Sequence, residues 1–445
     1  MRVSSLTFVA VGDCIISRRC SHRKEPGFLD LVEKIRKADV AHANLEIMIP
    51  KPPFIPSSEY GGMHLSAPAF VLDELKWIGF NIYNIANNHS ADYTFHGLLD
   101  TIDALEERDM VYAGGGANLG EARSPAYIET DVGRIAIIGA ASSFVTGAHA
   151  AAARPDMPGR PGLNPLRIDR DFVLTAQQIA WLTEIDKALG TAAVTERRRQ
   201  FGLFPEWKEG ALKFMGLDFF TGDIPAFRQK AKKEDVDEIC HWIRDARRQA
   251  DFVVMSLHAH HGINGDGNNP EMAEFLPEVA HAFIDAGADA FVGHGPHMLR
   301  PIEIYKGKPV FYSLGNFIFA LEGIRRYPSE MYERHKFGPD ATPADVADAW
   351  TKDKEGRPHG FPADRRFYET VLPVCRFEDG VLAEMQLHPL SLRHEAARTR
   401  RGEPVLACAT AGREILERLA EASAPFGLKI RIEPDGERVV GCTSW

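Results

Sequence analysis

Short apolar segments of strand length alternate with helical segments along much of this chain, and this alternation most constrains the fold. Leu6 to Gly12 is an apolar run of strand length, and Gly27 to Ala38 carries apolar residues at helical spacing. Val40 to Leu45 again has the pattern of a strand. Repeated strand–helix–strand units predict a layered α/β fold in which helices pack over sheets. Further strands are predicted over 81–86, 111–113, 134–140, 252–257, 290–292 and 310–313, and further helices over 69–79, 96–108, 235–250 and 270–286.

Two segments interrupt this pattern and set the predicted domain organisation. Residues 148–250 begin with a stretch rich in Pro and Gly and continue with charged helical sequence, so we interpret them as a helical insertion. Residues 321–366 have the polar, proline-containing composition of a lid or loop insertion. We therefore predict one catalytic domain over 1–320 that contains the helical insertion. Residues 367–445 are expected to add hairpin strands and a helix to the same domain.

The composition excludes several classes of protein. A hydrophobic content of 44% with 26% charged residues is typical of a folded protein. The formal charge of −10 argues against a nucleic-acid partner, because a phosphate backbone requires a basic surface. The six cysteines form no close CxxC pair, which favours a reduced compartment over a disulfide framework. No apolar stretch approaches the roughly 20 residues that span a bilayer. We expect a cytoplasmic protein without a membrane anchor.

Residues of the types that bind metals follow the predicted strands. The carboxyl ends of parallel strands are where α/β sheets place their sites. Carboxylates, an amide oxygen and imidazoles together suit one or two divalent cations, with Mn²⁺, Zn²⁺ or Fe²⁺ favoured and Ca²⁺ or Mg²⁺ as further options. A pair of ions needs a bridging carboxylate, and Glu46 is the natural candidate. The predicted ligands are Asp13, Glu46, Asn88, His258, His294 and His297.

Five motifs extend this interpretation to a family. They are VGDCIISR from Val11, NLE from Asn44, ANNHSADY from Ala86, GRPGLNPLR from Gly159 and GHGPHMLRPIEIYKGKPVFYSLGNFIF from Gly293. In these motifs the chain resembles the CapA family of capsule and poly-γ-glutamate biosynthesis, a branch of the calcineurin-like metallophosphoesterase superfamily. The resemblance runs from the N-terminus to about Phe319. It implies a four-layer β-sandwich flanked by helices.

The resemblance also implies roles for individual residues. It assigns one metal to Asp13, Glu46 and His297, and assigns the other metal to a second group of ligands. His89 matches the superfamily histidine that faces the substrate and can donate a proton. Asp92 could orient His89, although capping the helix that follows is the favoured role. The second group consists of Glu46, Asn88, His258 and His294.

The chain departs from the family pattern in two places. The phosphoesterase motif begins Asp-x-His, but Ile15 stands at the third position here, which removes an imidazole from one metal site. The run from His258 to His261 replaces a usual His-Trp-Gly. We expect His258 to be the ligand, because it directly follows a strand. His260 could instead bind the metal or act as the acid/base, and the third histidine of the run would then serve the loop.

Three functions fit these residues. The first is hydrolysis of an amide, γ-glutamyl or ester bond by a metal-activated water, with His89 or His260 protonating the leaving group. The second is metal-dependent epimerisation of a peptide, in which two bases remove and return a Cα proton. The third is a non-catalytic subunit of poly-γ-glutamate or capsule synthesis. The expected substrate is a small peptide or glutamyl compound, and the sequence leaves the oligomeric state open.

Overall fold

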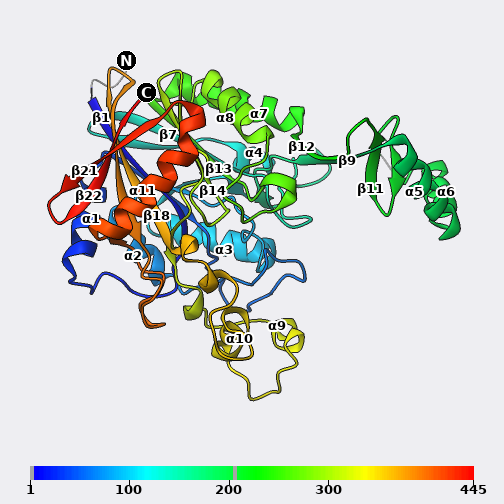
Figure 1. Ribbon diagram of the computed structural model, residues 1–445, viewed down its shortest axis with the longest axis horizontal. Helices are drawn as coiled ribbons and strands as arrows, with labels where there is room; N and C mark the ends of the chain where they lie inside the picture. The colour runs from blue at the N-terminus through cyan, green and yellow to red at the C-terminus, as the bar shows by residue number, and fades with distance from the viewer. Residues whose placement is uncertain (1–4, 204–207) are drawn as a thin grey trace.

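The computed structural model describes residues 5–203 and 208–445, and two large β-sheets form its body (Figure 1). In the first sheet, β1 to β4 run parallel to one another. The parallel strand β17 and the antiparallel strand β18 lie on the other side of β1. The strands of this sheet are β1 (Ser5–Ile15), β2 (Val40–Leu45), β3 (Ile82–Asn84), β4 (Val111–Ala113), β17 (Asn316–Phe319), β18 (Glu369–Glu378), β19 (Val381–Ser391), β20 (Val405–Leu406), β21 (Lys429–Asp435) and β22 (Arg438–Ser444).

The second sheet has the strand order β15-β16-β14-β13-β7-β6. Its four inner strands are parallel, and its two edge strands are antiparallel to their neighbours. The register places His258 at the end of one inner strand opposite His294 at the end of the next. The strands are β6 (Ala126–Thr130), β7 (Gly133–Ala141), β13 (Phe252–His258), β14 (Ala290–His294), β15 (Ile302–Tyr305) and β16 (Lys308–Phe311).

Alternating side chains of the strands separate the body into layers. Phe8 of β1 and Val254 of β13 belong to one buried cluster between the two sheets. Val9 of β1 instead packs in the cluster under three helices, and Met255 of β13 packs under two others. The order helix, sheet, sheet, helix confirms the predicted four-layer α/β sandwich. The covering helices are α1 (Pro26–Arg36), α2 (Phe70–Ile78) and α3 (Thr94–Glu106) on the first sheet, and α7 (Lys233–Gln249) and α8 (Phe275–Ala286) on the second.

One predicted helix is shorter than expected. The helical pattern over 270–286 predicts a single helix, but α8 begins at Phe275. The preceding residues extend along the loop that follows β13, where Met272 forms a β-bridge with Gly262. The Ile263 amide also donates to the Glu271 carbonyl at 3.0 Å. Tertiary pairing with this loop therefore replaces the first helical turns.

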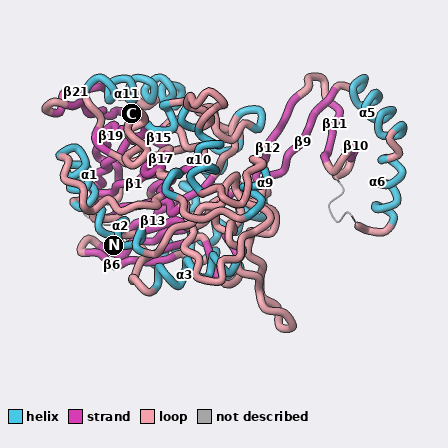
Figure 2. Tube along the Cα trace, turned by 90° about the horizontal axis from the view of Figure 1, so that it is seen from below, coloured by secondary structure: helices cyan, strands magenta, loops and turns pink. Residues whose placement is uncertain are grey.

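The segment interpreted as a helical insertion also contains strands. A four-stranded sheet in the order β10-β11-β9-β12 and two helices form an arm, residues 168–203 and 208–231, that extends away from the body (Figures 1 and 2). A small antiparallel pair lies nearer the body. The elements of the arm are β9 (Ile168–Leu174), α5 (Ala176–Ala188), α6 (Thr191–Gln200), β10 (Leu212–Phe214), β11 (Leu217–Thr221) and β12 (Ala226–Ala231). The small pair consists of β5 (Gly115–Gly116) and β8 (Gly162–Leu163), and the short helix α4 (Leu119–Arg123) follows β5.

The segment over 321–366 carries two short helices, α9 (Ser329–Arg334) and α10 (Pro343–Thr351). After it, β18 and β19 form the predicted hairpin and join the first sheet. Helix α11 (Ala409–Ser423) buries Ile415 and Leu416 in the cluster between the sheets. Among the described residues, no helix is long and apolar enough to cross a bilayer.

Candidate metal centre

Polar side chains from five parallel strands converge at one edge of the sandwich. Asp13 lies near the end of β1, Glu46 directly follows β2, and His258 and His294 end β13 and β14. The adjacent loops add Asn88 and His89 after β3, and His260 and His297 after β13 and β14. Because parallel strands end at the same edge, residues far apart in the sequence meet there. The structure thus brings all six predicted ligands to one region.

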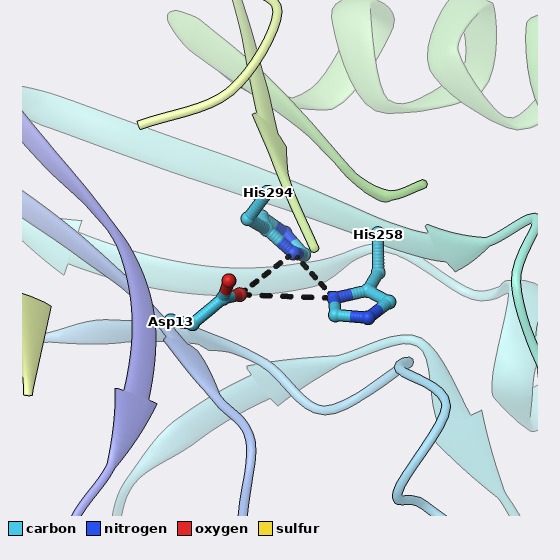
Figure 3. Close-up of side chains that lie close together, drawn as sticks. All are labelled: Asp13, His258 and His294. Carbon is cyan, nitrogen blue, oxygen red and sulfur yellow. Dashed lines mark hydrogen bonds and ion pairs between the residues drawn. The ribbon is translucent and has the colours of Figure 1, made fainter. Parts of the chain in front are cut away.

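Three of these residues form a fully buried group, Asp13, His258 and His294, each with 0% exposure. Their side chains point toward one another (Figure 3). Oδ1 of Asp13 lies 3.8 Å from Nδ1 of His258 and 3.7 Å from Nδ1 of His294. The two imidazole Nδ1 atoms are 3.0 Å apart. Donors that share an ion at about 2.1 Å lie roughly 3 to 4 Å from one another, so this buried group has the dimensions of a metal site.

A second group, Glu46, His260 and His297, also has donor atoms within 4.8 Å of one another. We call it the cavity-facing group, because His260 and His297 line the mainly apolar cavity beside it. Nε2 of His258 lies 3.8 Å from Oε1 of Glu46, so the His258 ring stands between the two groups. This division differs from the one that the family resemblance implies, in which Asp13 and His297 share an ion.

The contacts of His297 explain the different division. Nδ1 of His297 lies 2.9 Å from Oδ1 of Asn316 and 3.3 Å from Oδ2 of Asp13. A proton on that nitrogen satisfies both acceptors, so Nε2 of the neutral ring carries the lone pair. Asp13 therefore contacts His297 as a hydrogen-bond partner in this arrangement, and a metal would meet the other nitrogen of the ring.

Several buried atoms of the kind that bind metals have no hydrogen-bond partner among the described residues at this edge. Buried polar atoms without partners are costly and call for a ligand or ion. The unpartnered atoms are Oε1 and Oε2 of Glu46, Oδ1 of Asn88, Nε2 of His258 and Nε2 of His260. Each is a carboxylate, amide or imidazole atom. A neutral His258 ring has one unprotonated nitrogen, so it can offer either Nδ1 to the buried group or Nε2 on the side of Glu46. The donor set therefore fits a borderline divalent cation.

The charge state of the site supports the same fit. Burial lowers the pKa of His260 to about 3 and that of His294 to about 4. These imidazoles are neutral near pH 7, as metal ligands must be. Burial raises the pKa of Glu46, and nearby Asp13 raises it further. Burial also opposes ionisation of Asp13, but the hydrogen bond with His297 and the surrounding imidazoles outweigh it and hold its pKa well below the usual range.

Backbone geometry fixes the position of Asp13. A Cβ at Gly12 would lie 1.9 Å from the Gly315 carbonyl oxygen, so only glycine permits this approach of β1 to the next chain segment. The Asp13 amide donates to that same carbonyl at 2.9 Å. The Gly295 amide, in turn, donates to Oδ2 of Asp13 at 3.1 Å. The Gly-Asp pair of the first motif thus serves the placement of one carboxylate.

Two asparagines inside the strands support the buried group. Neither was assigned a role from the sequence, although Asn44 opens one of the family motifs. Nδ2 of Asn44 donates to Oδ1 of Asp13 at 2.8 Å, and Nδ2 of Asn84 donates to Oδ1 of Asn44 at 2.8 Å. Both are fully buried. The period-2 pattern of β2 could have indicated Asn44, because it shares a strand face with Val40 and His42.

His89 forms a pair with Asp92. Nδ1 of His89 lies 2.7 Å from Oδ2 of Asp92, and Nε2 lies 3.8 Å from Oε1 of Glu46. The favoured prediction that Asp92 caps the next helix is wrong: α3 begins at Thr94 after Tyr93 without a side-chain cap. Asp92 instead accepts hydrogen bonds from the amides of Leu65 and Gly61. These bonds fix its carboxylate toward the His89 ring.

His261, the third histidine of the run from His258, and Glu303 both have partners outside the two donor groups. His261 uses both ring nitrogens, with Nδ1 2.8 Å from Oε1 of Gln229 and Nε2 3.2 Å from the Ser142 carbonyl oxygen. Glu303 pairs with His281 at 3.0 Å and accepts a hydrogen bond from the Tyr312 hydroxyl. His261 is thus the satisfied loop histidine of its run, and Glu303 does not orient a ligand imidazole.

A cavity of about 620 Å³ opens beside the cavity-facing group. Its size is in the range of pockets for small molecules. Ile15 lines it, at the position where the phosphoesterase motif has histidine. Arg170 is the one Lys or Arg side chain among the described residues that line it. The ring-bearing lining residues include Phe144, Phe227, Phe319, Trp350 and Phe361. The walls are therefore mainly apolar, with metal-ligand types at one end.

Comparison with known proteins identifies the family. Residues 7–321 match the model of the family described as "Bacterial capsule synthesis protein PGA_cap". The chain belongs to this bacterial capsule-synthesis family, as the CapA-type motifs predict. Sinorhizobium fredii has two proteins, y4sH and y4uA, that are 37% identical to it over 97% of this chain and 92% of their own length. The capsule biosynthesis protein CapA of Bacillus anthracis is 28% identical over 61% of this chain and 48% of its own length.

One solved structure is also similar at a distant level. It is a Staphylococcus aureus protein described as a "Putative 5'-Nucleotidase", crystallised with alpha-ketoglutarate, with 13% identity and a TM-score of 0.32. The match covers 69% of this chain and 48% of that protein.

Proposed function

We propose that this chain is a metal-dependent enzyme that hydrolyses an amide, γ-glutamyl or ester bond of a small peptide or glutamyl substrate. The observation that carries the proposal is the set of buried, unpartnered donor atoms on Glu46, Asn88, His258 and His260. Hydrolysis needs such donors next to a space that admits a substrate. His260 and Asn88 belong to this set of atoms and also line the cavity of about 620 Å³.

The chain offers ligands for one or two divalent cations. The buried group and the cavity-facing group would each hold an ion, with the His258 ring between them. A cation bound there would polarise a carbonyl oxygen and lower the pKa of a water molecule toward neutrality. The metal identity is open between Mn²⁺, Zn²⁺ and Fe²⁺, because imidazole and carboxylate ligands suit all three.

His89 is the residue best placed to donate a proton to the leaving group. Its Nδ1 is held at 2.7 Å by Asp92, so its Nε2 is directed toward Glu46 and the centre. A histidine fixed through one nitrogen is suited to transfer a proton through the other. Asp92 is buried and accepts two backbone hydrogen bonds, which keep it in place as a positioning residue.

The cavity supports a substrate with an apolar part. Its aromatic lining, which includes Phe227 and Trp350, favours burial of a hydrophobic group. Arg170 could pair with a terminal carboxylate of a peptide. A substrate with many negative charges would find few cations on these walls.

The test is hydrolysis by protein reconstituted separately with Mn²⁺, Zn²⁺ or Fe²⁺. The substrates are γ-glutamyl anilides, short peptide anilides with an apolar side chain, and p-nitrophenyl esters. We expect turnover that a chelator abolishes, that the metal restores, and that His89→Gln strongly reduces. His281→Gln is the matched control, because His281 contacts Glu303 and Tyr305 outside the centre. Turnover that survives complete removal of metal would contradict the proposal.

A specific observation also favours peptide epimerisation as a second candidate. His89 follows a strand of the first sheet and His260 follows a strand of the second, and both line the cavity. Two histidines on different sides of a bound peptide could remove and return a Cα proton. Incubation of the peptide panel in D₂O separates the two reactions. Deuterium at Cα without cleavage supports epimerisation, whereas cleavage products support hydrolysis.

The third reading is a non-catalytic role in poly-γ-glutamate or capsule synthesis, and it rests on family membership. It predicts that the reconstituted protein binds metal but neither cleaves nor deuterates any substrate of the panel. Binding to a synthetase complex without turnover would favour this reading over both reactions.

A further inference from the structure

A buried histidine between the two sheets has no part in the proposed reaction. His42 lies in the middle of β2, and its exposure is 0%. Its Nε2 lies 2.9 Å from Oγ of Ser256, in β13 of the opposite sheet. The same hydroxyl lies 2.9 Å from Nε2 of His294 in β14. The chain His42–Ser256–His294 therefore crosses the sheet interface and ends at a ligand of the buried group.

The direction of these hydrogen bonds follows from the chemistry of His294. Its Nδ1 faces Asp13 and His258, so binding a cation there requires a lone pair on Nδ1. The proton of the neutral ring is then on Nε2, which donates to Oγ of Ser256. The Ser256 hydroxyl is left to donate to Nε2 of His42. One proton arrangement therefore satisfies both contacts and keeps Nδ1 of His294 free.

The state of His42 is consistent with its role as the acceptor. Burial, reinforced by nearby His294, lowers the pKa of His42 to about 3, so the ring is neutral and has one unprotonated nitrogen. The backbone of Val11 opposes this shift. When the Ser256 hydroxyl donates to Nε2, the proton of the neutral ring is on Nδ1, which has no hydrogen-bond partner among the described residues. The rings of His42 and His294 are also near-parallel, with centroids 6.2 Å apart and an angle of 27°.

We propose that Ser256 and His42 are positioning residues that hold His294 in the tautomer whose Nδ1 binds a cation. The affinity of the buried group for metal then depends on a hydrogen-bond chain from the other sheet. This inference rests on the proposed function only in that the buried group binds a metal, and it is independent of which reaction follows.

The alternative is that His42 and Ser256 only fill space between the sheets. Loss of packing would lower the stability of the fold without selectively changing metal affinity. The two roles therefore differ in whether a substitution lowers the metal affinity as well as the free energy of unfolding. Outer hydrogen-bond partners of ligand histidines typically change metal affinity by about 10- to 100-fold.

The experiment compares the metal affinity of four single variants and one double variant by chelator competition with Mn²⁺ and Zn²⁺, starting from metal-free protein. Ser256→Ala removes the hydroxyl, and His42→Phe removes the acceptor but keeps a ring. His42→Gln restores an acceptor oxygen. Ser423→Ala is the matched control, because Ser423 is also fully buried but lies away from the centre, where its Oγ accepts from the Ile302 amide at 3.0 Å. Urea unfolding of each metal-free variant measures stability separately.

We expect Ser256→Ala and His42→Phe to weaken metal binding at the buried group by about 10- to 100-fold. His42→Gln should recover most of that loss, and Ser423→Ala should lower stability without weakening metal binding. The double variant Ser256→Ala/His42→Phe should be no weaker than the worse single variant, because both break the same chain. A Co²⁺ spectrum that changes in Ser256→Ala but not in Ser423→Ala would support altered ligation.

Unchanged affinity in folded Ser256→Ala or His42→Phe protein would overturn the inference, as would equal loss of affinity in Ser423→Ala. If Ser256→Ala does not fold, the contrast between His42→Phe and His42→Gln decides the matter. Failure of the proposed function has a different signature: metal binding would respond to these variants while no substrate is turned over.

Discussion

The two donor groups share one edge of the sandwich but differ in their surroundings. The buried group, Asp13, His258 and His294, has no exposed surface and is braced by Asn44, Ser256 and the Gly295 amide. The cavity-facing group, Glu46, His260 and His297, lies against a 620 Å³ cavity. Rigid, fully enclosed donors favour tight and persistent binding of an ion. Donors beside a cavity can also meet a substrate. The difference suggests a division between a holding site and a reacting site.

The strongest test of this division is loss of the carboxylate of the buried group. Asp13→Asn keeps the size of the side chain but removes the charge that three imidazoles surround. We expect the tighter metal affinity to fall by more than about 100-fold, which exceeds the usual effect of an outer partner. Turnover should fall below detection. Equilibrium dialysis followed by metal analysis measures the change, and unaltered metal content would argue against the division.

Loss of His89 should separate metal binding from chemistry. His89→Gln leaves both donor groups intact, so we expect metal content to stay at the wild-type level. Turnover should fall by about 10²- to 10⁴-fold, which is the usual contribution of a positioned acid or base. The measurement is kcat at saturating metal. Asp92→Asn should show a smaller loss and a shifted pH profile, because it only positions the ring. A parallel loss of metal in His89→Gln would instead make His89 a ligand.

Loss of His260 should affect the cavity-facing group alone. Its Nδ1 contacts Oδ1 of Asn268 at 3.1 Å, and its Nε2 has no partner among the described residues. We expect His260→Asn to weaken the looser metal site by at least about 10-fold and to leave the tighter site unchanged. A two-site titration with Mn²⁺ separates the two effects. Equal weakening of both sites would mean that the groups act as one.

The stability of the metal-free protein should depend on pH through His42. Its folded-state pKa is about 3, whereas an unfolded histidine has a pKa of about 6.5. Between these values the unfolded chain binds a proton that the folded chain does not, so stability falls as the pH falls. One proton contributes a slope of about 1.4 kcal/mol per pH unit. His42→Gln should remove that slope between pH 6 and 4, and exposed His96→Gln should not, in urea unfolding.

The smallest expected effect concerns substrate binding. Arg170 is exposed and lines the cavity at a distance from the buried group. Arg170→Gln should raise KM by about 10-fold for substrates with a free carboxylate, with little change in kcat or metal affinity. Arg228→Gln is the matched control, because Arg228 neighbours Phe227 on β12 but does not line the cavity. Equal KM values for carboxylate and amide substrates would exclude this contact.

The sequence predicted the body of the fold well for a physical reason. Strands that are buried on both faces appear as continuous apolar runs, as in β7 and β13. Ligand-type residues at their ends could then be assigned to one edge, and Asp13, Glu46, His258 and His294 do meet there. The strands of the arm could not be predicted in this way. They are half-exposed and mix charged with apolar residues, so their pattern resembled charged helices.

The partners of the predicted ligands also escaped prediction. His42, Asn44 and Ser256 lie inside strands, where a polar residue gives no sign of which contact it makes across the sheets. His42 and Ser256 are 214 residues apart in the chain, and their contact depends on how the two sheets pack against each other. The division of ligands between groups depends on ring orientation, as His297 shows. Neither property is a function of spacing along the sequence.

The most direct test of the two metal sites is a titration of metal-free wild-type protein and of Asp13→Asn with Mn²⁺, measured by calorimetry. We expect saturable binding with a tight component that Asp13→Asn removes, and a weaker component that remains. Absence of stoichiometric binding of Mn²⁺, Zn²⁺ or Fe²⁺ by folded wild-type protein would contradict this expectation, and so would identical titration curves for the two proteins.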